Sequence, residues 1–294
     1  GMMKEAFQST RFGTAAREMI DTVNGILHEY AQQGYDLSLR QLYYQLVSRN
    51  IVPNTERSYK NVGNLVSDAR LAGMVDWDMI RDRGRTVEVN PHWDDPETFV
   101  ASVAGQYRFD LWADQPTYVE VMVEKQALEG VLAPVCRQLD VPFTANKGYS
   151  SSSAMYEASK RFLAKHAQGK DLFVIYLGDH DPSGIDMTRD VADRIALFTA
   201  HAGIDVRRIA LNMDQVEELD PPENPAKLTD SRALDYIRRF GHSSWELDAI
   251  EPRHLAELVA DAILACMDQP LFEKSVRRME QARKDIREAA KHIR

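Results

Sequence analysis

The second part of the chain alternates short apolar runs with helical patterns, and this alternation constrains the fold more than any other feature. Four runs have the length and apolar content of buried strands, and segments with helical periodicity separate them. Such an order predicts an α/β fold with a mostly parallel sheet that helices cover on both faces. The expected strands are "YVEVMVE" from Tyr118, "VPFTAN" from Val141, "DLFVIYLG" from Asp171 and "DVRRIAL" from Asp205.

Acidic residues stand where two of these strands end. Glu124 ends the first strand, and Asp179 and Asp181 follow the third. Ligands of parallel sheets gather at the carboxyl ends of the strands, so these side chains are expected at one edge. Carboxylates held together repel one another, and oxygen ligands without a nearby Cys or His set favour Mg²⁺ or Mn²⁺. The pattern predicts such a metal site, with the intervening His180 pointing to solvent.

A helix cap is the alternative for part of this pattern. Asp181, Ser183 or Asp186 could each close the amino end of the following helix. Glu124 belongs to a different strand, and its presence favours the metal site.

The first ninety residues indicate a helical module. Periodicity predicts a helix over 15–32, a second helix that Ser38 and Gln41 begin with a capping box, and a third with a polar outer face. The basic turn "RDRGRTVEV" follows. This order is typical of a winged-helix DNA-binding module, and a small helical bundle with a charged solvent face is the open alternative. The expected DNA contacts are Arg57, Lys60, Arg83 and Arg85.

These motifs together resemble a known family. "VMVEK", with Glu124 and Lys125, and the later "GDHDPSGIDM" resemble the TOPRIM domain, in the particular form found in the A subunit of topoisomerase VI and its meiotic double-strand-break relatives. "NKGYSSSSAMYEASKRFL" is similar to the glycine-containing loop and helix between those motifs, and "SLRQLYY" to the catalytic segment. "WELDAI" is a weaker match. The resemblance spans about Leu37 to Ile250.

The resemblance implies a type IIB-like topoisomerase subunit that cleaves and religates DNA through a 5′-phosphotyrosyl link. It implies that Tyr44 is the nucleophile, and a helical wheel selects the same residue. Tyr43 shares the apolar stripe with Leu42, whereas Tyr44 falls off the stripe, toward solvent, on the face of Arg40. Arg40 is expected to favour the phenolate and to bind the phosphate.

Further roles follow from the same resemblance. Glu124 is expected to take part in catalysis with magnesium or manganese, and Lys125 and Gly148 are expected near DNA. The site is expected to be completed between two protomers, which implies a homodimer on double-stranded DNA. The chain has no GxxxxGK[ST] motif, so strand passage would need a separate ATPase partner similar to the B subunit.

The expected organisation has four parts. Residues 1–90 form the winged-helix domain with the candidate tyrosine, 91–117 a connector, 118–230 the TOPRIM domain and 231–294 a C-terminal helical region. Two other functions stay open: a metal-dependent TOPRIM nuclease that uses water, and a DNA-binding protein with an inactive metal site.

Composition limits the partners. The formal net charge of −9 argues against loose, charge-driven attachment to DNA, although residues 35–85 carry eight Lys and Arg against six Asp and Glu. No apolar run approaches the roughly 20 residues that span a bilayer, so no membrane association and a cytoplasmic location are expected. Cys136 and Cys266 lack metal-site spacing and are expected to be buried thiols.

Overall fold

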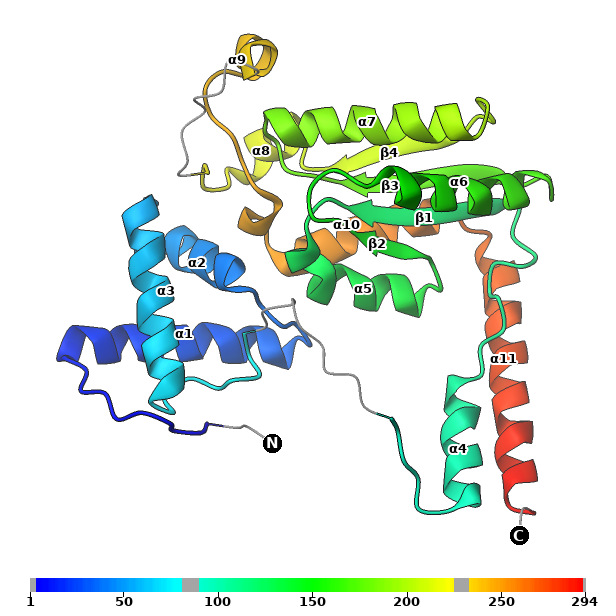
Figure 1. Cartoon of the computed structure of the whole chain (residues 1–294), viewed down its shortest axis with the longest axis horizontal. Coiled ribbons are helices and arrows are strands. Elements are labelled where there is room, and N and C mark those ends of the chain that lie inside the picture. Colours follow the sequence, from blue (N-terminus) through cyan, green and yellow to red (C-terminus); the bar gives the residue numbers. More distant parts are fainter. Residues whose placement is uncertain (1–3, 81–89, 225–232, 293–294) are drawn as a thin grey trace.

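The computed structural model describes residues 4–80, 90–224 and 233–292. A four-stranded parallel sheet with covering helices forms the larger part of the molecule, and three N-terminal helices form a second group beside it (Figure 1). The α/β class with a parallel sheet is therefore confirmed. The basic turn at 81–89, with Arg83 and Arg85, lies outside the described residues.

The sheet forms where the alternation predicts it. All neighbouring strands are parallel, in the order β2-β1-β3-β4. Val123 at the end of β1 lies opposite Leu177 at the end of β3, so the residues that follow both strands meet at the same edge. The strands are β1 (Thr117–Val123), β2 (Phe143–Ala145), β3 (Asp171–Leu177) and β4 (Asp205–Ala210).

Helices cover both faces of this sheet (Figure 1). Successive side chains of β1 enter opposite cores, with Val121 on one face and Met122 on the other. The Met122 face packs under α6 (Ser152–His166) and α7 (Pro182–Phe198). The Val121 face packs under α5 (Glu129–Gln138), which the short helix η1 (Gln126–Leu128) precedes, and α10 (Pro252–Ala265). Cys136 and Cys266 are buried free thiols, as predicted.

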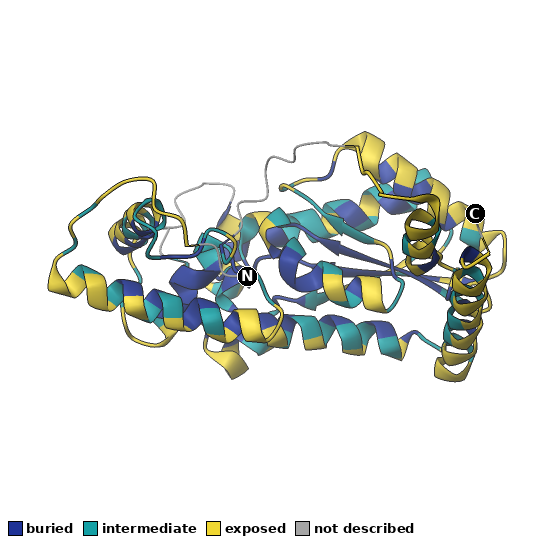
Figure 2. Ribbon diagram, turned by 90° about the horizontal axis from the view of Figure 1, so that it is seen from below, coloured by how far each residue is buried: buried dark blue, intermediate teal, exposed yellow. Residues whose placement is uncertain are grey.

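The three N-terminal helices surround a core of their own. They are α1 (Thr14–Gln32), α2 (Leu39–Ser48) and α3 (Glu56–Leu71), and the capping box of Ser38 and Gln41 is present at the start of α2. Six consecutive residues of α2, 41–46, are buried. At about 100° per residue these cover every side of the helix, so α2 is enclosed all round over this stretch. Figure 2 shows the buried interior of this group and of the sheet.

The remaining helices extend from the sheet. α4 (Pro96–Gln106) lies beside α11 (Gln269–Ala290) at the far end of the molecule (Figure 1). α8 (Met213–Leu219) follows β4, and α9 (Leu234–Phe240) and η3 (Leu247–Ala249) lead into α10. No helix in the described ranges is both long and apolar enough to cross a membrane.

Candidate functional site

Two acidic residues meet at the carboxyl edge of β1 and β3. Glu124 Oε1 accepts a hydrogen bond from the Asp179 backbone amide at 2.6 Å. Gly178 permits this approach, because a Cβ atom there would lie 2.9 Å from Glu124 Oε2 and 2.8 Å from Arg208 Nη1. Both acids are buried. The structure therefore brings together Glu124 and Asp179, which are separated by 54 residues in sequence.

This pair carries shifted pKa values. Burial raises the pKa of Glu124 to about 8, and the nearby Asp179 adds to the rise. Burial also raises the pKa of Asp179 to about 6, although Lys125 acts in the opposite direction. Glu124 Oε2 is buried and makes no hydrogen bond. The edge therefore favours a proton or a cation beside Glu124.

Asp181, the third predicted metal ligand, acts as a helix cap. Its side chain accepts a hydrogen bond from the Gly184 amide at 2.6 Å and so caps α7. The cap alternative is thus correct for Asp181, whereas Asp186 pairs with Arg189 at 2.8 Å. Asp181 follows Asp179 by two residues at the start of α7, and its charge raises the pKa of both Glu124 and Asp179. All three predicted metal ligands therefore lie at one edge.

Lys125 has acidic partners within the chain. Its Nζ lies 2.9 Å from Asp179 Oδ2 and 2.7 Å from Asp248 Oδ2. Glu246 Oε1 is 3.6 Å away. Burial alone would lower the pKa of Lys125, but these three carboxylates raise it well above the usual value. Lys125, expected near DNA, is therefore a permanent cation that holds these carboxylates together.

Tyr44 and Arg40 reach the same acids through Glu246. The Tyr44 hydroxyl donates to Glu246 Oε2 at 2.8 Å, and Arg40 Nε donates to the same oxygen at 2.8 Å. Burial would raise the pKa of Glu246, but Lys125 and Arg40 lower it below its ordinary value, so Glu246 is ionised. We call these connected residues, together with Asp181 at the start of α7, the edge cluster. Its members are Arg40, Tyr44, Glu124, Lys125, Asp179, Asp181, Glu246 and Asp248.

The prediction that Tyr44 points to solvent is wrong. Tyr44 is only 1% exposed, because its ring belongs to the helical core together with Tyr43, and Glu246, next to η3, covers its hydroxyl. Burial and the charge of Glu246 raise the pKa of Tyr44 well above that of a free phenol. Tyr43 lies in the helical core, as predicted, and its hydroxyl contacts the Thr55 carbonyl at 3.1 Å.

His180 also differs from its prediction. It is 2% exposed rather than facing solvent, and its Nδ1 lies 2.8 Å from the Tyr236 hydroxyl. Its backbone pairs with Trp245 in both directions, at 2.9 and 3.0 Å. This bridge fixes the segment that carries Glu246 at the edge of the sheet. His180 is thus a structural link between Asp179 and the distant Glu246.

Arg208 is a site residue that the sequence analysis missed. Its guanidinium donates to the carbonyls of Gly178, Asp179, Gly184 and Leu211 at 2.6 to 3.2 Å, and to Thr188 Oγ1 at 2.6 Å. These bonds clamp the loop after β3 to the start of α7. The sequence contained one signal, since Arg207 and Arg208 are adjacent in β4 and must face opposite sides of the sheet.

We expect Arg208→Lys to destabilise the fold by about 2–4 kcal/mol, because three ammonium donors cannot replace five hydrogen bonds in a partly buried position. Arg207→Lys is the matched control. Its side chain is half exposed and pairs with Asp205 at the surface, so its loss should cost less than about 1 kcal/mol. Urea unfolding of both variants measures the difference. If the two variants had equal urea unfolding midpoints, the hydrogen bonds of Arg208 would not stabilise the fold as proposed.

The other predicted residues lie apart from the edge cluster, with one exception. Arg57 and Lys60 are exposed on α3, where Lys60 lies 3.5 Å from Glu56. Gly148 has a φ of +80°, which favours glycine, and its amide donates to the Glu124 carbonyl at 3.2 Å. Gly148 therefore turns the loop after β2 against the site.

The edge cluster contains the carboxylate oxygens that a hard divalent cation prefers, but these oxygens do not form a complete coordination sphere. Across residues 4–80, 90–224 and 233–292, no group of three or more His, Cys, Asp or Glu side chains is arranged to hold a metal ion. Asp179 Oδ2 is engaged by Lys125. The unpartnered, buried Glu124 Oε2 and an excess of carboxylates over cations fit Mg²⁺ or Mn²⁺. Binding would require Asp179 to release Lys125 in part.

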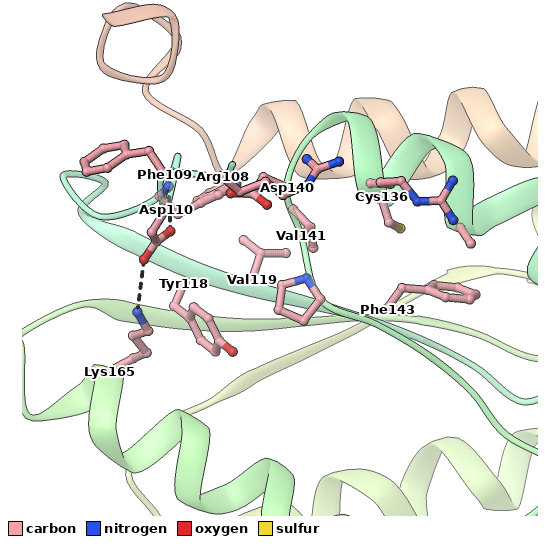
Figure 3. Close-up of a pocket in the computed structure, with 14 residues that line it drawn as sticks. Arg108, Phe109, Asp110, Tyr118, Val119, Cys136, Asp140, Val141, Phe143 and Lys165 are labelled. Atoms are coloured by element: carbon pink, nitrogen blue, oxygen red, sulfur yellow. Dashed lines mark hydrogen bonds and ion pairs between the residues drawn. The ribbon is translucent and has the colours of Figure 1, made fainter. Parts of the chain in front are cut away.

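A separate pocket of about 720 Å³ lies at the opposite end of β1 (Figure 3). Tyr118, Val119 and Phe143 line it. Its acidic residues are already engaged, since Asp110 lies 3.6 Å from Lys165 and Asp140 accepts a hydrogen bond from the Leu111 amide at 3.0 Å. The acidic side chains of this pocket therefore do not form a second candidate cation site.

Comparison of the chain with protein-family models, with curated proteins and with solved structures finds no match in any of the three.

Proposed function

We propose that the chain cleaves DNA by transesterification, with Tyr44 as the nucleophile and the acids of the edge cluster as its metal site. One observation carries this proposal. Tyr44 and Arg40 come from an N-terminal helix, yet Glu246 and Lys125 connect them to Asp179, whose amide in turn donates to Glu124. A tyrosine, an arginine and several carboxylates are the groups that phosphoryl transfer to a phenol requires.

The proposed step is a transesterification at one phosphorus of the DNA backbone. The Tyr44 oxygen attacks a backbone phosphorus, an O–P bond forms, and the bond from phosphorus to the 3′ oxygen breaks. The phenol proton passes to Glu246, its hydrogen-bond acceptor, and the leaving 3′ oxygen takes a proton from water. Arg40 binds the phosphate oxygens. The bond energy is kept in the 5′-phosphotyrosyl link, so religation is the reverse reaction and needs no ATP.

A divalent cation would be held by Glu124, Asp179 and Asp181. When bound, it supplies positive charge that neutralises the developing charge at the leaving oxygen. Lys125 would stay beside Asp248 as a fixed positive charge, while Asp179 would release it in part. Strand passage would still need an ATPase partner, because the chain has no P-loop motif.

Burial of Tyr44 favours a second candidate function. The phenol is covered, and the carboxylate that covers it makes the phenolate harder to form. A metal-dependent nuclease that uses water would need Glu124, Asp179 and Asp181 but not Tyr44. The two functions differ in their products, because only the first leaves protein joined to DNA.

The test is incubation with plasmid DNA in magnesium or manganese, followed by denaturation with detergent. Transesterification predicts protein-linked 5′ ends that require the metal and are lost in Glu124→Gln. Free 5′-phosphate ends would support the water-using nuclease. Binding without any cleavage, over a full range of metal concentrations, would leave only the DNA-binding protein with an inactive site.

A further inference from the structure

We propose that the pocket at the amino end of β1 binds a small organic anion that has an aromatic body. Figure 3 shows this pocket, which has a volume of about 720 Å³. Small-ligand sites typically have volumes of about 300–1,000 Å³. The pocket uses none of the residues of the edge cluster, which follows the other end of β1, so this binding is separate from the proposed DNA cleavage.

The pocket lies where β2 stops short of the beginning of β1. β2 pairs only with Val121 to Val123, so no described strand adjoins the earlier residues of β1 on that side. Pro142 precedes β2 and has no N–H group with which to extend the ladder. The space that a longer strand would fill lies beside Val119, and α5 and residues 108–112 form its other walls.

The inner wall of the pocket is apolar and aromatic. Val119, Cys136 and Val141 line it and are at most 6% exposed. Phe109 and Phe143 also line the pocket and are half-buried (Figure 3). Phenylalanine rings pack well against flat aromatic groups, and removing such a group from water is favourable. The wall therefore suits a ligand with an aromatic body better than a bare inorganic ion.

The outer part of the pocket carries positive charge that the chain does not neutralise. Arg108 and Arg137 line the pocket, are exposed, and form no ion pair with any residue that the structure describes. The third cation of the lining, Lys165, lies 3.6 Å from Asp110. The carboxylate of Asp140 accepts a hydrogen bond from a backbone amide at 3.0 Å. Both acids are therefore engaged, and two arginines are available to an anion from solution.

A further arginine adds to this charge from α11. The Cζ atom of Arg278 lies 4.3 Å from the ring centroid of Phe109, which lines the pocket. The chain has a formal net charge of −9, yet arginines gather here, and their attraction for an anion extends over about 8 Å at physiological ionic strength. Arginine binds carboxylates and phosphates through the same paired N–H donors. The charged group of the ligand is therefore a carboxylate or a phosphate.

Isothermal titration calorimetry of the whole chain, without divalent cations, tests the proposal. Adenosine monophosphate joins an aromatic body to a phosphate, and naphthoate joins one to a carboxylate. Adenosine lacks the anion, and inorganic phosphate lacks the aromatic body. We expect one or both of the first two probes to bind, and the last two to bind at least about tenfold more weakly. The tighter of the first two probes identifies the preferred anionic group.

Variants locate the binding. Arg108→Gln combined with Arg137→Gln should weaken binding by about tenfold or more, because the charge-assisted hydrogen bonds to the anion are lost. Both side chains are exposed, so the fold should persist, and thermal unfolding checks this. Ala133→Leu should also weaken binding, because it fills the pocket from α5 without a change of charge. Arg17→Gln, which removes an exposed arginine of α1, is the control and should stay within about twofold of the wild type.

Three results would overturn the proposal. The first is that neither adenosine monophosphate nor naphthoate binds at millimolar concentration. The second is that the double arginine variant binds as tightly as the wild type, which would place the ligand elsewhere. The third is an equal loss of affinity in Arg17→Gln, which would reveal a general effect of net charge. These titrations contain no DNA, so their failure leaves the proposed cleavage untouched.

Discussion

Tyr44→Phe is expected to abolish the protein-linked DNA product, because phenylalanine has no oxygen to attack phosphorus. The fold should survive the change. The substitution removes one hydroxyl that donates to Glu246, and the loss of one such bond costs on the order of 1–3 kcal/mol. Detergent-quenched plasmid assays measure the adduct, and thermal unfolding measures the stability of the same preparation.

Tyr43→Phe is the matched control for this prediction. The neighbouring tyrosine is equally buried and its hydroxyl also accepts and donates hydrogen bonds, but to the Pro53–Thr55 turn rather than to Glu246. Its adduct level should stay near that of the wild type. Loss of adduct in both variants, with equal loss of stability, would point to a structural role for this helix and not to a nucleophile.

Lys125→Met is expected to destabilise the protein by about 3–5 kcal/mol, because Asp179, Asp248 and Glu246 would share a buried site without their common cation. Methionine keeps much of the length and apolar volume of the side chain. Magnesium should recover part of the lost stability, because a cation that binds only the folded state shifts the unfolding equilibrium. Urea unfolding with and without magnesium measures both effects.

Lys147→Met provides the control. Lys147 forms an isolated backbone bridge with Lys125, but it is exposed, so its replacement should change stability by less than about 0.5 kcal/mol. If the two variants unfold at the same urea concentration, Lys125 does not hold the acids together. If magnesium leaves Lys125→Met unchanged, the edge cluster is not a divalent-cation site.

Local patterns predicted the sheet and part of the site. Strand length and apolar content located β1 to β4, and parallel topology then required Glu124 and Asp179 to share an edge. These inferences need only neighbouring residues and one general rule of strand arrangement. The capping box at Ser38 is equally local, and it is present.

The surroundings of Tyr44 could not be predicted in this way. The helical wheel assumes that α2 has one buried side, but residues from beyond position 245 cover the other side, about 200 positions later in the chain. The same segment supplies Glu246 and Asp248 as acidic partners of Lys125, which no local pattern indicated. Periodicity within one helix carries no information about such a partner.

Arg208 and His180 show a second limit of prediction from local sequence patterns. Alternation states that Arg207 and Arg208 face opposite sides, but only the assembled sheet shows which one meets the loop after β3. His180 was expected outside because it separates two aspartates. Its backbone pairing with Trp245 turns it inward instead. In both cases the deciding contact joins segments that are far apart in sequence.

The most direct measurement of the central claim is mass spectrometry of the DNA-linked protein after nuclease and trypsin digestion. Cleavage after Arg40 and Arg49 releases the peptide QLYYQLVSR, which contains both tyrosines of α2. Attack by Tyr44 predicts a nucleotide joined through a 5′ phosphate to the second of them, Tyr44. A nucleotide on any other residue, or cleaved DNA with no peptide attached, would contradict it.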